Sequence, residues 1–501
     1  MASSLLKSAG RAAAWSALAN WFGLLGGLVS LVVLARLLSP TEFGIYGMVL
    51  VALALPETIA CNSQNESLIQ REKLSRQHAN AIFYLSLALA TVFFIIIQLI
   101  APLAALAFDE PRVTPMFRVM SFALFIGAFT SVPAALLQRQ LKFRKIMEVD
   151  VIGILVGAVV GITLAILLKS AWALVWMELI RRFVRMLAFN VQARWWPTRA
   201  VQWQALKDLA PYNLKTTAIQ LIKSAETMVP RAMVGAWLGP AALGIFNLAL
   251  RIMEQLSQAL VLPLAGISLA VTSRAQKDFP TLHKAIEGGM RLASLFGYPA
   301  FIGMAVIAPA LIPIVFGDEW QAAVPAAQIA LLMGLCGPTS ALNAGILKGV
   351  GRPGVWLKIQ SFSLAITLIL IPFIVRYGLE AVMLTLLAQR ILVWIIGATC
   401  IRAIVRFPLH RQFVAVYPAM LAALVMGAVV YVVYRFTPAD WGPTATLILP
   451  IAVGMIVYII AFAAISPRLA VRFVKAARLF QQGDSEGAKA LIQRQRPVPQ
   501  V

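Results

Sequence analysis

The chain has 501 residues, of which 60% are hydrophobic and only 13% are charged, and its mean hydropathy is +0.84. Soluble globular domains carry roughly 50% apolar and 25% charged residues, so this composition excludes a soluble protein and predicts an integral membrane protein. The formal net charge of +23 does not indicate nucleic-acid binding, because the basic residues are spread in small groups between apolar runs.

Apolar runs separated by Pro, Gly and charge clusters predict an all-α fold of about fourteen transmembrane helices. A helix needs about 20 apolar residues to cross the bilayer. Helices are expected because lipid cannot satisfy free backbone groups, and the runs are too long for barrel strands. The first six spans are predicted at residues 14–38, 43–66, 79–106, 115–137, 147–168 and 172–194. The other eight are predicted at 212–237, 241–267, 285–315, 322–347, 355–375, 379–402, 413–434 and 443–465.

An internal repeat organises these spans. Residues 38–46 recur as residues 238–246 in the pattern Leu-x-Pro-x-x-x-Gly-Ile-aromatic, and the Phe-Asp-Glu of residues 108–110 recurs within residues 316–319. Each copy of the first pattern lies between two apolar runs, which predicts a tight helical hairpin whose outer turn is closed by its Pro and Gly. The repeat therefore predicts two lobes of six spans.

The predicted domain boundaries follow from this repeat. They are an N-lobe over 1–200, a C-lobe with an interfacial helix over 201–407, spans 13 and 14 over 408–466, and a cytoplasmic amphipathic and disordered tail over 467–501. Since each lobe holds an even number of spans, we expect pseudo-twofold symmetry about the membrane normal and a substrate path between the lobes. Basic residues gather in alternate connections, which predicts that both termini are cytoplasmic.

Several of these segments resemble a known family. Residues 34–46 (LARLLSPTEFGIY), 68–71 (LIQR), 137–144 (LQRQLKFR) and 238–246 are similar to segments of the bacterial polysaccharide flippases of the Wzx type. These flippases belong to the multidrug, oligosaccharidyl-lipid and polysaccharide exporter superfamily. The resemblance covers essentially the whole chain. One departure is the polar stretch at residues 61–66, where relatives often carry a Gly-rich and weakly polar sequence.

The resemblance implies a flippase of the bacterial inner membrane that has no enzymatic activity, cofactor or metal. Its substrate would be an undecaprenyl-diphosphate-linked oligosaccharide repeat unit, moved from the inner to the outer leaflet by alternating access. The products would serve exopolysaccharide, capsule or O-antigen synthesis. Membrane lipids, a proton or sodium ion as coupling ion, and the polysaccharide polymerase machinery are the further partners that it implies.

Charged residues inside the predicted spans are the most informative, because each costs roughly 2.5–3.5 kcal/mol at the bilayer centre. Eight cations fall there against four carboxylates, and this excess suits a diphosphate in a cationic cavity. Glu178, Arg181, Arg182 and Arg185 share one helical face, since they stand at i, i+3, i+4 and i+7. The predicted substrate-binding residues are Arg181, Arg182, Arg185, Lys223, Arg231, Arg251 and Arg390. Glu57, Glu226 and Glu254 are the predicted ion-coupling residues.

Three alternatives stay open at this level. The pairs Lys223–Glu226, Arg251–Glu254 and Glu178–Arg182 are also consistent with local ion pairs that hold helices together. A drug or cation antiporter of the same superfamily would need an acidic, aromatic-lined cavity, which the cationic excess disfavours. A membrane-embedded polymerase or glycosyltransferase would need catalytic groups on substantial loops, whereas the predicted outer connections are only a few residues long.

Overall fold

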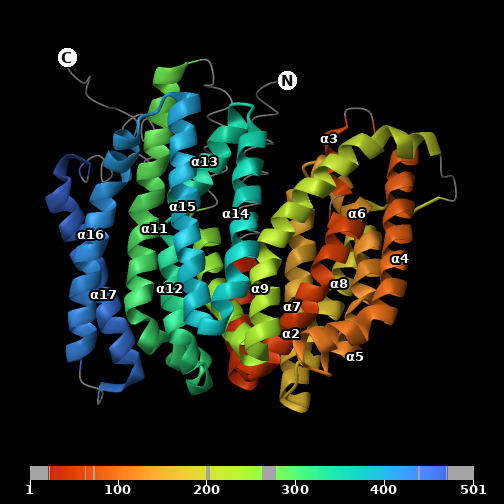
Figure 1. Ribbon diagram of the computed structural model, residues 1–501, viewed down its shortest axis with the longest axis horizontal. Helices are drawn as coiled ribbons and strands as arrows, with labels where there is room; N and C mark the ends of the chain where they lie inside the picture. The colour runs from red at the N-terminus through yellow and green to blue at the C-terminus, as the bar shows by residue number, and fades with distance from the viewer. Residues whose placement is uncertain are drawn as a thin grey trace. The chain divides into compact units, whose positions relative to one another are not determined.

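The computed structural model describes residues 21, 23–62, 64–71, 74–198, 203–261, 278–437, 441–469 and 471. These residues form helices joined by short turns, as the composition predicted (Figure 1). A short apolar helix, Gly23–Leu37, precedes α2. The helices that follow in the first half are α2 (Pro40–Glu57), the π-helix η1 (Thr58–Asn62), α3 (Asn65–Gln70), α4 (Arg76–Phe108), α5 (Val113–Met120), α6 (Phe122–Arg139), α7 (Phe143–Leu168), α8 (Trp172–Ala193) and α9 (Trp203–Leu260).

The second half continues in the same way. Its helices are α11 (Phe279–Phe316), the 3-10 helix η2 (Asp318–Ala323), α12 (Val324–Gly334), α13 (Gly337–Gly349), α14 (Pro353–Ile374), the 3-10 helix η3 (Val375–Tyr377), α15 (Leu379–Val405), α16 (Leu409–Phe436) and α17 (Gly442–Ile465). The chain divides into two compact units, and we refer to Met1–Asn247 with Leu364–Leu379 as the first unit and to Leu248–Ser363 with Glu380–Val501 as the second.

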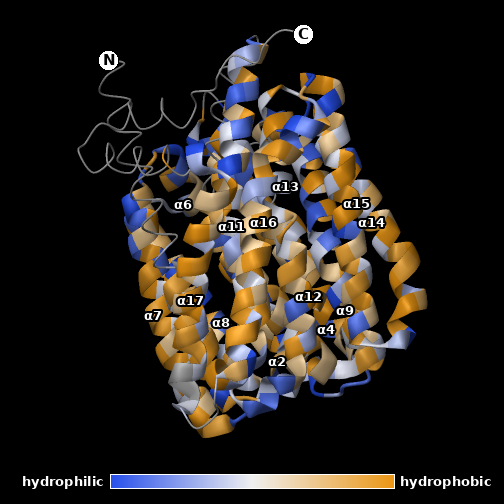
Figure 2. Ribbon diagram, turned by 90° about the vertical axis from the view of Figure 1, so that its left-hand side faces the viewer, coloured by the Kyte–Doolittle hydropathy of each residue, from blue (hydrophilic) through white to orange (hydrophobic). Residues whose placement is uncertain are grey.

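Every predicted span corresponds to one or more helices among the described residues, although residues 14–20, 22, 63 and 262–267 lie outside them. Ten of these helices are long and apolar enough to cross a membrane, or eleven if α12 and α13, bent by 42°, count as one broken span. Apolar residues dominate the middle of these helices, and hydrophilic residues gather toward their ends (Figure 2). The count of about fourteen stays a prediction. So do the four domain boundaries, and the tail beyond residue 471 lies outside the described residues.

The turns of the two halves share an unusual backbone conformation. Positive φ angles occur at Asp109, Leu141, Lys169 and Arg194 in the first half and at Gly317, Gly351, Gly378 and Arg406 in the second. Each position of the first set precedes its counterpart in the second by 208 to 212 residues. A left-handed residue ends a helix and turns the chain, so the repeated sequence ends its helices at matching places.

The two copies of the Pro-x-x-x-Gly pattern begin helices, as the hairpin prediction required. Pro40 stands at the start of α2 after an extended Ser39, and Gly239 (φ 82°) kinks α9 just before Pro240, so that α9 consists of two helices. Proline suits this place because its fixed φ fits the first turn and its missing N–H would have no helical partner there.

The predicted role of the glycine in this pattern is wrong, because Gly44 and Gly244 lie within helices rather than in the turns. A Cβ on Gly44 would stand 1.7 Å from the carbonyl oxygen of Pro240, and a Cβ on Gly244 would stand 1.9 Å from that of Pro40. The two copies therefore cross each other in reciprocal backbone contact. Such close helix crossings need glycine because any side chain would hold the backbones apart.

In the second unit, α16 and α17 do not stand apart from the other helices. The buried face of α16 includes Ala415, Ala419, Ala422 and Met426, which belong to one apolar core with residues of α11. A Cβ on Gly427 of α16 would stand 2.7 Å from Ile302 of α11, which shows how closely the two helices approach. Spans 13 and 14 thus form part of the packed core of this unit.

Candidate functional site

Charged side chains of α8 converge on one carboxylate in the first unit. Glu178 accepts hydrogen bonds from Arg181 Nε (2.8 Å) and Nη2 (2.6 Å), and from Arg182 Nε (2.6 Å). The spacing i, i+3, i+4 places these donors beside Glu178 on the helix surface, as the sequence predicted. The Glu178 side chain is only 8% exposed, so its charge depends on these two guanidinium groups for its solvation.

Arg182 also connects α8 to the end of α2. Its Nη1 donates to Glu57 Oε1 at 2.6 Å, so one guanidinium bridges two carboxylates. Glu57 is the last residue of α2, and the π-helix Thr58–Asn62 follows directly. Single π-helical turns inside α-helical spans occur frequently at functional sites. The structure therefore brings one predicted coupling residue, Glu57, against the predicted arginine face.

Polar residues in and just before the stretch at residues 61–66 join η1 and α3 to α9. The Oγ atoms of Thr58 and Ser224 lie 2.8 Å apart, and Gln220 Nε2 donates to Glu66 Oε1 at 2.8 Å. Gln220 and Ser224 stand one turn apart on the same face of α9. Thr58, just before this stretch, and Glu66 within it thus hold span two against the first helix of α9.

Arg185 pairs with a residue that the sequence analysis did not include. Its Nη2 lies 2.7 Å from Asp150 Oδ1 on α7. Asp150 lies inside the predicted span at residues 147–168, so a complete count of intramembrane carboxylates would have found it. The prediction considered pairs close in sequence, whereas this pair joins two helices.

A glycine groove on α7 positions the arginine stems. A Cβ on Gly153 would stand 2.4 Å from Arg185 Cγ, and one on Gly157 would stand 3.0 Å from Arg181 Cβ. Gly161 makes the same kind of close approach to Met177, at 2.7 Å from its sulfur. The spacing Gly153-x3-Gly157-x3-Gly161 was a readable signal for this contact, because small residues four apart let two transmembrane helices approach closely.

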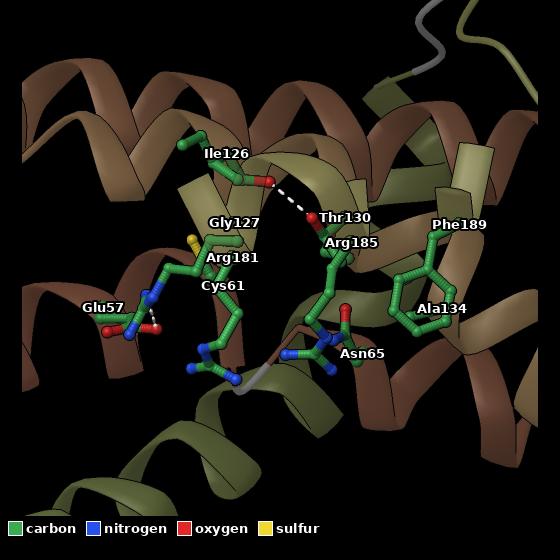
Figure 3. A pocket seen from close by; sticks show the side chains of 12 residues that line it. Glu57, Cys61, Asn65, Ile126, Gly127, Thr130, Ala134, Arg181, Arg185 and Phe189 are labelled. Carbon is green, nitrogen blue, oxygen red and sulfur yellow. Dashed lines mark hydrogen bonds and ion pairs between the residues drawn. The ribbon is translucent and has the colours of Figure 1, made fainter. Parts of the chain in front are cut away.

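These groups surround a cavity of about 260 Å³ within the first unit. The guanidinium groups of Arg181 and Arg185 point into it (Figure 3). The cavity is lined by Glu57, Cys61, Asn65, Ile126, Gly127, Thr130, Ser131, Ala134, Arg181, Arg182, Arg185 and Phe189. The lining is thus mostly polar, although the surrounding helices are apolar enough to span a membrane.

The charges around this cavity balance. Arg181 and Arg182 pair with Glu178 and Glu57, and Arg185 pairs with Asp150. Three cations thus meet three carboxylates. The cationic excess expected from the sequence therefore does not come from α8, and it depends on the remaining predicted cations. The local ion pair Glu178–Arg182, weighed as an alternative, is present.

The other predicted site residues lie on helices that do not line this cavity. Lys223, Arg231, Glu226, Arg251 and Glu254 lie on α9, and Arg390 lies on α15. The side chains of Lys223, Arg251 and Arg390 are exposed, whereas those of Arg231, Glu226 and Glu254 are half-buried. Arg251, Glu254 and Arg390 belong to the second unit. Among the predicted residues, Arg181, Arg182, Arg185 and Glu57 meet at this cavity.

The sequence is similar to proteins of bacterial polysaccharide biosynthesis. A family model described as polysaccharide biosynthesis protein matches residues 33–325, which is more than half of the chain. The lipopolysaccharide biosynthesis protein WzxC of Escherichia coli is 25% identical over 73% of this chain and 74% of its own length. The succinoglycan biosynthesis transport protein ExoT of Rhizobium meliloti is 23% identical over 71% of this chain and 72% of its own length.

Solved structures with a similar fold are membrane transporters. The lipid II flippase MurJ in an inward closed conformation superposes with a TM-score of 0.76 at 13% identity, over 90% of this chain and 98% of its own. An inward-facing multidrug resistance transporter of the MATE family gives a TM-score of 0.60 at 16% identity, over 77% of this chain and 96% of its own. These similarities show the fold, and at such identities they leave the substrate open.

Proposed function

This chain belongs to the polysaccharide biosynthesis protein family, and we propose that it is a flippase for undecaprenyl-diphosphate-linked oligosaccharide repeat units. It moves them from the inner to the outer leaflet for exopolysaccharide, capsule or O-antigen synthesis. The multi-span helical fold supports this proposal, and so does the similarity to WzxC and ExoT, which are named as proteins of lipopolysaccharide biosynthesis and succinoglycan transport. The protein performs no covalent chemistry on the substrate and resides in the bacterial inner membrane with both termini in the cytoplasm.

The observation that carries the proposal is a set of exposed cations within apolar helices. Lys223, Arg251 and Arg390 expose their side chains although they lie in helices that are long and apolar enough to cross a membrane. A cation facing lipid at such a position costs roughly 2.5–3.5 kcal/mol, so these groups need water or an anion. The diphosphate of the substrate supplies that anion, and Arg presents paired donors to its oxygens.

The transport cycle then follows from the chemistry of the substrate. The headgroup enters from the inner leaflet while its polyprenyl tail stays in lipid, and alternating access releases the headgroup outward. Arg231, Arg181, Arg182 and Arg185 are further candidates for contacts with the headgroup. Glu57, Glu226 and Glu254 are the candidates for a proton or sodium ion that resets the cycle, and the polymerase machinery receives the product.

Replacement of Arg251 by Ala tests this proposal. We expect polysaccharide export to fall to the level of a deletion strain while the variant stays in the membrane, and lipid-linked repeat units to accumulate on the inner leaflet. Arg144→Ala is the matched control, because Arg144 forms an exposed pair with Glu148 at the start of α7 and should leave export unchanged. Normal export by the Arg251→Ala variant would show that Arg251 does not bind the substrate. Unchanged lipid-linked intermediates in a deletion strain that becomes drug-sensitive would favour an antiporter instead.

A further inference from the structure

The cavity beside α8 presents both hydrogen-bond donors and acceptors that lack partners. Arg185 Nε and Asn65 Oδ1 are buried and have no hydrogen-bond partner among the described residues. Thr130 and Ser131 donate their hydroxyl protons to the carbonyl oxygens of Ile126 (2.7 Å) and Ala128 (2.9 Å). Their hydroxyl oxygens therefore remain available as acceptors toward the cavity.

A ligand in this cavity must accept a hydrogen bond from Arg185 Nε and donate one to Asn65 Oδ1. A phosphate or diphosphate oxygen accepts hydrogen bonds, so it would satisfy Arg185 Nε but would oppose Asn65 Oδ1 and the Glu57 carboxylate. A hydroxyl group both donates and accepts, and it can satisfy both kinds of atom. Because a buried polar atom without a partner costs about 1–3 kcal/mol, a ligand that serves both kinds has the advantage.

The balance of charge points the same way. Arg181, Arg182 and Arg185 are already paired with Glu178, Glu57 and Asp150, so the cavity offers no net positive charge to an anion. Charged groups that are paired in this way act as strong, fixed hydrogen-bonding groups toward a neutral ligand.

The size of the cavity suits one sugar unit. Its volume of about 260 Å³ accommodates a single pyranose ring, and because the cavity is open on one side, the rest of a longer saccharide can extend outside it. Phe189 also lines the cavity, and the guanidinium carbon of Arg185 lies over its ring at 5.7 Å from the ring centre, which helps to fix the position of Arg185.

We propose that this cavity binds one neutral hexose ring of the lipid-linked oligosaccharide, and that the diphosphate binds elsewhere. The proposal rests on the flippase function above and assigns the first unit to recognition of the sugar. Asn65 and Arg185 are the residues that make this contact specific, since each holds a polar atom that only the ligand satisfies.

Ligand-observed NMR on the purified full chain in detergent tests this assignment. Saturation transfer from the protein to D-glucose, D-galactose and D-mannose is measured, with inorganic diphosphate as a competitor. We expect at least one hexose to bind with a Kd on the order of 1 mM, and diphosphate to leave that signal unchanged. Arg185→Lys keeps the charge opposite Asp150 but loses the Nε donor, and Asn65→Leu loses the acceptor. Each should raise the Kd by about tenfold, whereas Arg144→Lys should not change it.

The same preparations separate this inference from the proposed function. Transbilayer movement of a lipid-linked oligosaccharide is measured in vesicles that contain the wild-type protein. Movement without any hexose binding would overturn the sugar site and leave the flippase function intact. Competition by diphosphate would assign the cavity to the anion and would also overturn the inference. Hexose binding without movement would contradict the flippase function. Size-exclusion elution of each variant excludes misfolding as the cause of a lost signal.

Discussion

A methyl group added at Gly44, where α2 crosses the second helix of α9, should measurably lower the free energy of unfolding of the protein. In Gly44→Ala the new Cβ would stand 1.7 Å from the carbonyl oxygen and 2.4 Å from the carbonyl carbon of Pro240. Backbone atoms cannot turn aside as the end of a side chain can, so the helices must separate by roughly 1 Å or more. Overpacking of this kind costs about 1–3 kcal/mol. The gain of about 0.5–1 kcal/mol from replacing a helical glycine by alanine offsets only part of that cost.

The reciprocal geometry predicts how two such changes combine. Gly244→Ala places its Cβ 1.9 Å from the carbonyl oxygen of Pro40, so it forces apart the same pair of helices. Once one methyl group has separated them, the second meets little resistance. The double variant should therefore lose about 1 kcal/mol less than the sum of the single losses, which is a coupling typical of residues in contact.

Equilibrium unfolding of the purified variants in mixed micelles measures these free energies. Gly288→Ala in α11 is the matched control, because a Cβ there meets no atom within 4 Å, and it should be neutral or slightly stabilising. We expect Gly44→Ala to be about 1–2 kcal/mol less stable than this control. Equal stability of the two variants, or strict additivity in the double variant, would refute the crossing as described.

Three further outcomes are expected. Glu178→Gln removes the buried carboxylate that the half-buried Arg181 and Arg182 share, while Arg182 keeps its pair with Glu57, so it should lose about 2–3 kcal/mol in the same unfolding measurement; a loss below 1 kcal/mol would contradict the cluster. In a variant without native cysteines, Thr58→Cys with Ser224→Cys should form a disulfide on mild oxidation, because the native Oγ atoms lie 2.8 Å apart; a gel shift after proteolysis detects it, and its absence argues against this contact. The hydrogen bond from Arg112 lowers the pKa of Glu110 in the turn between α4 and α5. The ionised Glu110 carboxylate therefore stabilises the folded state at pH values above its unfolded pKa of about 4.3. This stabilisation is lost as pH falls through the lower folded pKa, so wild type and Glu110→Gln should have the same thermal stability at low pH.

The sequence by itself determined the membrane class and the order of the helices. Composition excludes a soluble globule, and the apolar runs identify the helices because each must satisfy its own backbone in lipid. The repeat at residues 38–46 and 238–246 also located the helix starts at Pro40 and Pro240. These are local properties, since a proline or an apolar run acts on its own segment of chain.

Local spacing predicted part of the candidate site. The face of α8 that carries Glu178, Arg181 and Arg182 follows from helical periodicity, and the structure shows these side chains joined. Glu57 and Asp150 could not be assigned as the partners of Arg182 and Arg185, because they come from α2 and α7. Local sequence patterns do not determine which helices pack against each other.

Only the tertiary structure decided what the charges and glycines do. It matched three arginines with three carboxylates, which leaves a balanced cavity where the sequence alone indicated an excess of positive charge. It also moved Gly44 and Gly244 from the turn into a crossing of two helices. Electrostatic pairing and close packing depend on distances between atoms far apart in sequence, and those distances exist only once the helices have packed.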